Sequence, residues 1–162
     1  MSADLSTSLP ATPALLAVGE RCSKTMRFSG EAIAEFARLT GDANPLHSDP
    51  LAAARSRHGR LIAAGQHTTS QLIGLAATHF SRGHGAADGE ALELLCLNFN
   101  FALKHPVFAD DVAELGWCVS SVEWSARLRG WLVQADGDVH VGERVCVVAR
   151  TTLLVKPFED TP

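Results

Sequence analysis

Hydrophobic and polar positions alternate with two different periods along this chain, one in each half. In the first half, apolar residues recur at the i, i+3 and i+4 spacing of a helix, which gives segment 31–39 one apolar face. Ser29 is placed to cap this helix, and Gly41 is suited to its end. The pattern therefore predicts an amphipathic helix over 31–39.

Two more helices and one strand are predicted in the first half. Segment 21–28 fits a short strand, and Asp49 followed by Pro50 begins a short helix over 51–55. The longest helical segment is about 63–80, which contains no proline and is mostly small and apolar. Such a composition predicts a buried helix.

The second half changes to a period of two, as in half-buried strands. Alternation predicts strands over 95–103, 113–119, 131–135 and 145–155, and the sequence Asp136-Gly137-Asp138 predicts a hairpin turn before the last of them. In the strand 95–103 the odd-numbered residues are the strongly apolar ones, so they are expected on one face. Helices followed by successive antiparallel strands indicate an α+β fold. Its sheet must cover an apolar face, and only the long central helix is large enough to do so.

Composition narrows the class of protein. With 162 residues, 46% hydrophobic and 20% charged, the chain is expected to form one soluble globular domain. A formal net charge of -4 argues against a general nucleic-acid binder. The cysteines lie far apart without a C-x-x-C pair, and the N-terminal segment resembles neither a secretion signal nor a membrane span. We therefore expect a cytoplasmic protein with no membrane partner.

Side chains able to do chemistry are densest between Thr40 and His47. Asp42 and His47 are five residues apart, so a helix would leave them about 140° apart and a strand roughly 17 Å apart. A turn brings them together, and Gly41 and Pro45 favour one. Held across a turn, a carboxylate and an imidazole can share one water and act as base and acid near neutral pH. A structural interpretation stays open, in which Asp42 closes an Asx-turn and His47 is a surface residue.

Three segments of the chain resemble one known family. Residues 36–50, FARLTGDANPLHSDP, closely resemble the signature of the MaoC-like dehydratases, the (R)-specific enoyl-CoA hydratase (hydratase 2) branch of the hotdog superfamily. Residues 61–65, LIAAG, resemble the opening of the family's central helix. Residues 101–112, FALKHPVFADDV, resemble its strand-loop-strand segment.

The resemblance implies a fold and a domain organisation. It covers about residues 17–156, which would form a single hotdog domain, with 1–16 a flexible N-terminal tail and 157–162 a C-terminal tail. In a hotdog fold a curved antiparallel sheet wraps around a long central helix, as the change of period already requires. The family resemblance also implies a homodimer or higher homo-oligomer, with the site near the subunit interface.

The activity implied by the resemblance is the reversible syn hydration of a trans-2-enoyl thioester to an (R)-3-hydroxyacyl thioester. The thioester would be carried by coenzyme A or a carrier protein, with no separate cofactor. Asp42 and His47 match the family's catalytic pair, and Gly65 matches the glycine whose backbone N–H stabilises the enolate oxygen. This position near a helix N-terminus suits negative charge. Asn44 is expected to orient Asp42 from within the turn, the alternative being a purely structural role.

The helix start departs from the family pattern. Ala64 stands where the family often has histidine, and Gln66 and His67 replace residues that are usually apolar or small. Gln66 is a candidate substrate-binding residue for this reason. The polar run Thr68-Thr69-Ser70 allows two interpretations: a pocket lining for a polar acyl group, or hydroxyls bonded back to helix carbonyls.

The remaining charged and titratable residues add candidate phosphate contacts to the predicted enoyl-thioester site. Arg55, Arg57, Arg60 and Lys104 flank the predicted site and are candidate partners for phosphates of the thioester arm, solvated loop charges being the alternative. The histidines and cysteines form no compact ligand motif, so no metal is predicted. A hotdog acyl-CoA thioesterase is the competing enzyme, disfavoured by the presence of both Asp42 and His47. A non-catalytic acyl-thioester-binding domain is kept open by the departures in the helix.

Overall fold

The computed structural model describes residues 11–13, 16–81 and 92–157. Most of the predicted tails lies outside this description, although Leu16, the last residue of the predicted N-terminal tail, is fully buried. The elements follow in the order β1 (Arg21–Arg27), α1 (Gly30–Thr40), η2 (Pro45–His47), α2 (Pro50–Arg55), α3 (Gly65–Ser81), β2 (Leu92–Leu103), β3 (Val112–Ser125), β4 (Gly130–Val141) and β5 (Arg144–Pro157).

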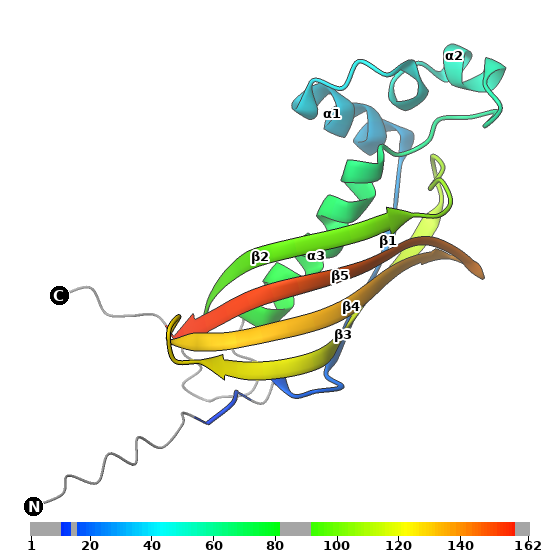
Figure 1. The fold of residues 1–162 in the computed structure, drawn as a ribbon. Coiled ribbons are helices and arrows are strands. Elements are labelled where there is room, and N and C mark those ends of the chain that lie inside the picture. The colour runs from blue at the N-terminus through cyan, green and yellow to red at the C-terminus, as the bar shows by residue number, and fades with distance from the viewer. Residues whose placement is uncertain (1–10, 14–15, 82–91, 158–162) are drawn as a thin grey trace, which may run out of the picture.

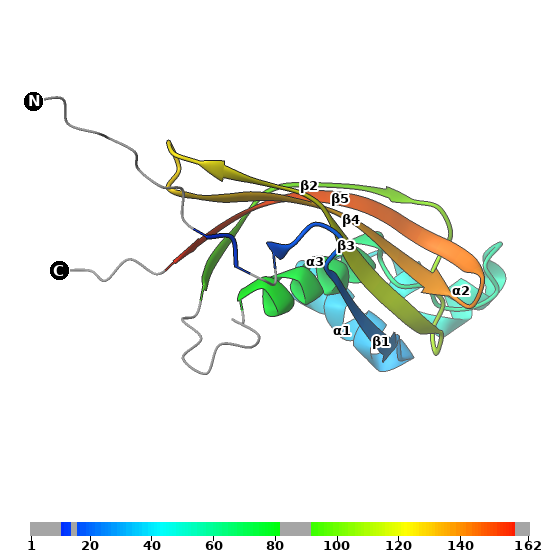
Figure 2. The same ribbon diagram turned by 90° about the horizontal axis from the view of Figure 1, so that it is seen from below.

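The five strands form one antiparallel sheet in the order β1-β3-β4-β5-β2. The sheet arches over α3, which lies along its concave face (Figures 1 and 2). The shorter helices α1 and α2 gather past one end of the sheet (Figure 1). This arrangement confirms the predicted α+β hotdog fold, a curved sheet wrapped around a long central helix.

The core lies between α3 and the concave face of the sheet. Leu72, Ala76 and Phe80 follow one another at helical spacing and are fully buried against it. On the sheet side, Trp117 of β3 is buried, and its indole N–H donates a hydrogen bond of 2.7 Å to the carbonyl of Leu72. Helix and sheet are thus joined by apolar burial and by one satisfied polar contact.

Helix caps hold the ends of the segment that carries the predicted site. The Ser29 hydroxyl accepts a hydrogen bond from the N–H of Ala32 at the start of α1, and Gly41 ends α1 with a φ of 70°. The Asp49 carboxylate accepts from the first N–H groups of α2, at 2.8 and 3.1 Å. The predicted caps are confirmed, and they fix where the chain leaves α1 and enters α2.

The predicted hairpin turn at Asp136-Gly137-Asp138 is wrong, because these residues lie inside β4. Gly137 pairs with Trp117 across the sheet, and a Cβ on this glycine would lie 2.5 Å from the indole ring. Glycine is therefore needed here to make room for a neighbouring aromatic ring. The actual turn follows at Gly142, which has a φ of 57°.

The prediction that all odd-numbered residues of β2 share one face is also wrong. The pairing with β5 shifts between Cys96 and Asn98, which leaves Leu97 as an extra, bulged residue. Leu94 packs against the core before the bulge, whereas Phe99 does so after it. The bulge therefore exchanges the two faces of the strand, an effect that simple alternation does not contain.

Candidate active site

The turn between α1 and η2 places the carboxylate of Asp42. The N–H of Asp42 donates to the carbonyl of Ala37, at 2.8 Å, so the residue directly continues the end of α1. Asp42 Oδ1 accepts from the N–H of Asn44 at 3.0 Å, and Asn44 Oδ1 accepts in turn from the N–H of Leu46 at 3.1 Å. Asp42 therefore closes an Asx-turn and keeps its Oδ2 free of these contacts.

His47 is buried at the end of η2, and its ring faces Asp42. His47 Nε2 lies 3.7 Å from Asp42 Oδ2. On the other side of the ring, Nδ1 lies 2.8 Å from the carbonyl oxygen of Ile62. A carbonyl only accepts hydrogen bonds, so Nδ1 carries a proton and Nε2 of the neutral ring presents a lone pair toward Asp42. The Asx-turn of Asp42 therefore coexists with the approach of its Oδ2 to His47, and His47 is buried, not a surface residue.

Asn44 makes two contacts within the same turn. Its side-chain oxygen caps η2 through Leu46, and its Nδ2 lies 3.4 Å from His47 Nε2. Its main-chain N–H is the group that holds Asp42 Oδ1. Asn44 thus contacts both members of the pair, one through its backbone and one through its side chain.

The N-terminus of α3 reaches the same place through a short pairing of two loops. Ile62 and Phe108 form an isolated antiparallel bridge, extended by a hydrogen bond of 2.8 Å from the N–H of Ala63 to the carbonyl of Val107. Gly65 begins the helix immediately after this bridge. The same pairing carries the Ile62 carbonyl that holds His47, so the histidine and the helix start are positioned by one feature.

Two N–H groups at the start of α3 have no acceptor in the part of the chain that the structure describes. The N–H groups of His67 and Thr68 both donate to the carbonyl of Ala64, at 2.9 and 3.3 Å. Those of Gly65 and Gln66 find no acceptor within residues 11–13, 16–81 and 92–157. A Cβ on Gly65 would overlap the end of the exposed Leu103 side chain, so a larger residue at position 65 would require that side chain to move aside.

A cavity of about 310 Å³ opens beside these groups and contains both His47 and Gly65 in its wall. Much of the remaining wall is apolar, supplied by Ile62, Ala63, Leu103, Pro106, Val107 and Val147. Asp42 lines a neighbouring hollow of about 240 Å³ together with Phe36, Thr40 and Gln66. The Asp42–His47 pair therefore lies between two spaces, one on each side.

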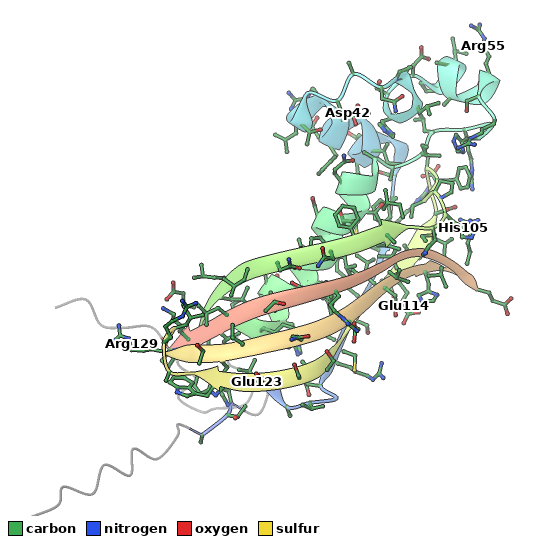
Figure 3. The ribbon with its side chains drawn as sticks, in the orientation of Figure 1. Asp42, Arg55, His105, Glu114, Glu123 and Arg129 are labelled. Atoms are coloured by element: carbon green, nitrogen blue, oxygen red, sulfur yellow. The ribbon has the colours of Figure 1, made fainter. Side chains whose placement is uncertain are left out.

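The larger cavity is bordered by basic side chains, namely Arg57, His58, Lys104 and His105. Of the basic residues predicted to flank the site, Arg57 and Lys104 line this cavity. In Figure 3, Asp42 and His105 lie at the same end of the molecule, and Arg129 lies at the other. Among the described residues no acidic side chain lines this cavity, so Arg57 and Lys104 bring positive charge to its wall in a chain whose net charge is -4.

Arg60, in contrast, is directed into a structural cluster beside the cavity and does not line it. Its guanidinium lies 3.1 Å from Asp111 Oδ1 and 4.5 Å from the centre of the Phe108 ring. Arg144 binds the other oxygen of Asp111 at 2.9 Å, and the N–H of Phe108 binds that oxygen at 3.0 Å. This cluster ties the loop after β2 to the segment that precedes α3.

The polar residues of the α3 start separate into distinct environments. His67 is buried, with its ring stacked on Phe36 at 4.6 Å and edge-on to Phe28, and burial lowers its pKa. The Thr69 hydroxyl donates back to the carbonyl of Gln66 at 3.3 Å, whereas Thr68 lines the larger cavity. Each predicted alternative for the hydroxyls therefore describes one of the two threonines.

Across residues 11–13, 16–81 and 92–157, no group of three or more His, Cys, Asp or Glu side chains is arranged to hold a metal ion. Within the same ranges, every helix is too short or too polar to span a bilayer.

The chain is similar in sequence to proteins of one known family. The family model "MaoC like domain" matches residues 17–129. The (R)-specific enoyl-CoA hydratase of Aeromonas caviae is 33% identical over 96 residues, which are 59% of this chain and 65% of that protein. The matched region thus spans slightly less than two thirds of the length of this curated relative.

Solved structures support the same relationship. The (R)-hydratase from A. caviae involved in PHA biosynthesis superposes with a TM-score of 0.73 and 25% identity, covering 86% of this chain and 97% of that one. A MaoC-like dehydratase from Rhodospirillum rubrum has a TM-score of 0.69 and 24% identity, covering 89% and 95%. Because the family model covers most of the chain, from before β1 to the turn between β3 and β4, this protein belongs to the MaoC-like domain family.

Proposed function

We propose that the protein catalyses the reversible hydration of a trans-2-enoyl thioester to an (R)-3-hydroxyacyl thioester. The observation that carries the proposal is the distance of 3.7 Å between Asp42 Oδ2 and His47 Nε2, beside the unpaired N–H of Gly65. The similarity to an (R)-specific enoyl-CoA hydratase supports the same reaction class.

The Asp42–His47 pair is suited to holding the reacting water. A separation of 3.7 Å is too long for a direct hydrogen bond, but one water oxygen can lie about 2.8 Å from both atoms. Both atoms accept hydrogen bonds in the neutral-histidine state, so the water presents its oxygen to C3 of the substrate. The pair removes one proton from this water and returns a proton to C2 from the same face, which makes the addition syn.

Gly65 supplies the electrostatic part of the proposed mechanism. Addition of water at C3 moves negative charge through C2 onto the thioester oxygen. The free N–H of Gly65 at the N-terminus of α3 is a preorganised donor for that charge, in a cavity with largely apolar walls. Asn44 keeps Asp42 and His47 in position through the contacts described above.

The basic border of the larger cavity is proposed to receive the phosphate-bearing arm of the thioester. Lys104 and Arg57 line the cavity, so they are the foremost candidates. Arg60 holds Asp111 beside the cavity, and Gln66 lines the smaller hollow together with Asp42. No cofactor beyond the coenzyme A or carrier-protein arm of the substrate is required. A homodimer remains part of the proposal.

Purified protein mixed with crotonyl-CoA tests the function. Loss of the conjugated enoyl absorbance without release of free thiol, with (R)-3-hydroxybutyryl-CoA as the product, is the expected result. Release of free thiol would indicate a thioesterase instead. Binding of the thioester with neither change would point to a non-catalytic acyl-thioester-binding domain. Because the acyl group is not specified by the site residues, the assay should include longer, branched and carboxylated enoyl-CoA substrates.

A further inference from the structure

Thr68 carries a hydroxyl that the proposed mechanism does not yet use. The residue is only 3% exposed and lines the same cavity as His47 and Gly65. Its hydroxyl has no hydrogen-bond partner among the residues that the structure describes. A few buried side-chain nitrogen atoms are both inaccessible to solvent and without a hydrogen bond, and the Thr68 oxygen is not one of these atoms. Since it also lacks a hydrogen bond, it must keep some accessible surface, and the cavity that Thr68 lines provides it.

The neighbouring threonine shows why this is unusual. A threonine hydroxyl inside a helix ordinarily donates to a carbonyl one turn earlier, and Thr69 does so with Gln66. The Ala64 carbonyl, one turn before Thr68, already accepts two backbone N–H groups. An unpaired hydroxyl in a cavity with largely apolar walls is unfavourable unless a ligand completes its hydrogen bonds.

Helix geometry directs this hydroxyl toward the N–H of Gly65. Residues three apart lie on the same helix face, and side chains lean toward the N-terminus of their helix. The side chain of Thr68 therefore covers the first turn, which begins at Gly65. Both residues line one cavity, which is where a ligand could meet the two donors together.

We propose that the Thr68 hydroxyl is a second donor to the thioester oxygen, acting together with the N–H of Gly65. This role rests on the proposed hydration and adds a catalytic residue to it. The O–H of Thr68 donates to the carbonyl oxygen of the bound thioester, and the hydrogen bond strengthens as enolate charge develops. Because the bond is stronger in the transition state than in the bound substrate, it acts mainly on kcat and little on KM.

Three substitutions test the role by activity. Thr68→Val removes the hydroxyl with little change of shape and is expected to lower kcat for crotonyl-CoA hydration by about 10²-fold, the scale for one oxyanion donor. Thr68→Ser keeps the hydroxyl and is expected to keep most of the activity. Thr69→Val is the matched control, because its hydroxyl is bonded to Gln66, and its kcat should stay near that of the unchanged protein.

Two activity results would overturn the role of Thr68. Equal losses in Thr68→Val and Thr68→Ser would show that packing, not the hydroxyl, matters. A wild-type kcat in Thr68→Val, with only its preference for polar acyl groups changed, would make Thr68 a residue of substrate selection instead.

A spectroscopic measurement separates this proposal from the hydration itself. Crotonyl-CoA labelled with ¹³C at the thioester carbonyl is bound to His47→Ala, in which turnover is expected to be slow. The carbonyl stretch should lie at lower frequency with Thr68 present than in His47→Ala/Thr68→Val. An unchanged frequency rejects the second donor even if hydration is confirmed. A shift in a protein that hydrates nothing keeps the donor and rejects the function, and failure to bind the thioester rejects both.

Discussion

His47 and His67 are both buried close to the start of α3, at 7% and 4% exposure, yet their surroundings differ in kind. His47 has one ring nitrogen held by the Ile62 carbonyl and the other directed at Asp42. His67 lies between Phe28 and Phe36, and its Nδ1 has no partner among the described residues. Burial alone therefore does not distinguish a histidine suited to chemistry from one that packs. The hydrogen-bond partners of the two ring nitrogens distinguish the two kinds of histidine.

The largest expected effect is loss of hydration when the Asp42–His47 pair is broken. Asp42→Asn and His47→Ala should each lower the rate by at least about 10²-fold, because each removes a proton-transfer group. His67→Phe, which keeps an aromatic ring between the two phenylalanines, should leave the rate within the normal range. Stopped-flow loss of enoyl absorbance measures the rates, and circular dichroism checks the fold. Near-normal turnover in a folded Asp42 or His47 variant would reject the assignment.

For the free energy of unfolding we expect His67 to matter, although its replacement should leave the hydration rate unchanged. His67→Ala removes a buried ring that stacks on Phe36 and should lower the free energy of unfolding by about 2–4 kcal/mol. His67→Phe should recover most of this loss, since it refills the space. Urea unfolding of the three proteins measures the difference. A His67→Ala protein as stable as the unchanged one would show that the stack with α1 contributes nothing.

The pH dependence of stability sharpens the contrast further. Burial lowers the pKa of His67, so the folded protein binds its proton less readily than the unfolded chain does. Stability contributed by neutral His67 is therefore complete well above pH 6.5, about the pKa of an unfolded histidine, and declines as the pH falls below it. His67→Phe should lose less stability between pH 7.5 and 5 than the unchanged protein, as measured by Tm. Parallel curves for the two proteins would contradict this.

The smallest effect is expected at Asn44. Asn44→Ala removes the cap of η2 and the contact with His47, at a cost of about 1 kcal/mol in stability, and should reduce turnover less than Asp42→Asn does. Asn44→Asp keeps a capping oxygen but loses the Nδ2 group near His47. Thermal unfolding and steady-state rates of both variants separate capping from positioning. If Asn44→Asp lost as much stability as Asn44→Ala, the capping role would be refuted.

Local features of the sequence predicted much of the fold and the Asp42–His47 turn. Ser29, Gly41 and Asp49 act within a few residues of themselves, so their roles follow from short-range chemistry. Strand alternation likewise predicted the buried faces of β3 and β4, because a period of two is a local property.

What was not predicted depends on contacts between distant residues. The sequence Asp136-Gly137-Asp138 has the composition of a turn, but Trp117 requires its glycine inside a strand. Arg60 is separated by 51 positions from Asp111, and only the fold shows that this partner directs it away from the cavity. The bond from His47 to the Ile62 carbonyl also crosses between two segments, so the orientation of the imidazole ring was not accessible from the motif.

The contact of Leu103 with Gly65 limits how this site can change over evolutionary time. Any side chain at position 65 would collide with Leu103 of β2, whereas Gln66, exposed beside it, meets no such limit. A larger residue at position 65 would require the exposed Leu103 side chain, which also borders the cavity, to move aside. Substitutions at 65 and 103 are therefore expected to be coupled, whereas substitutions at 66 can change the surroundings of Asp42 independently.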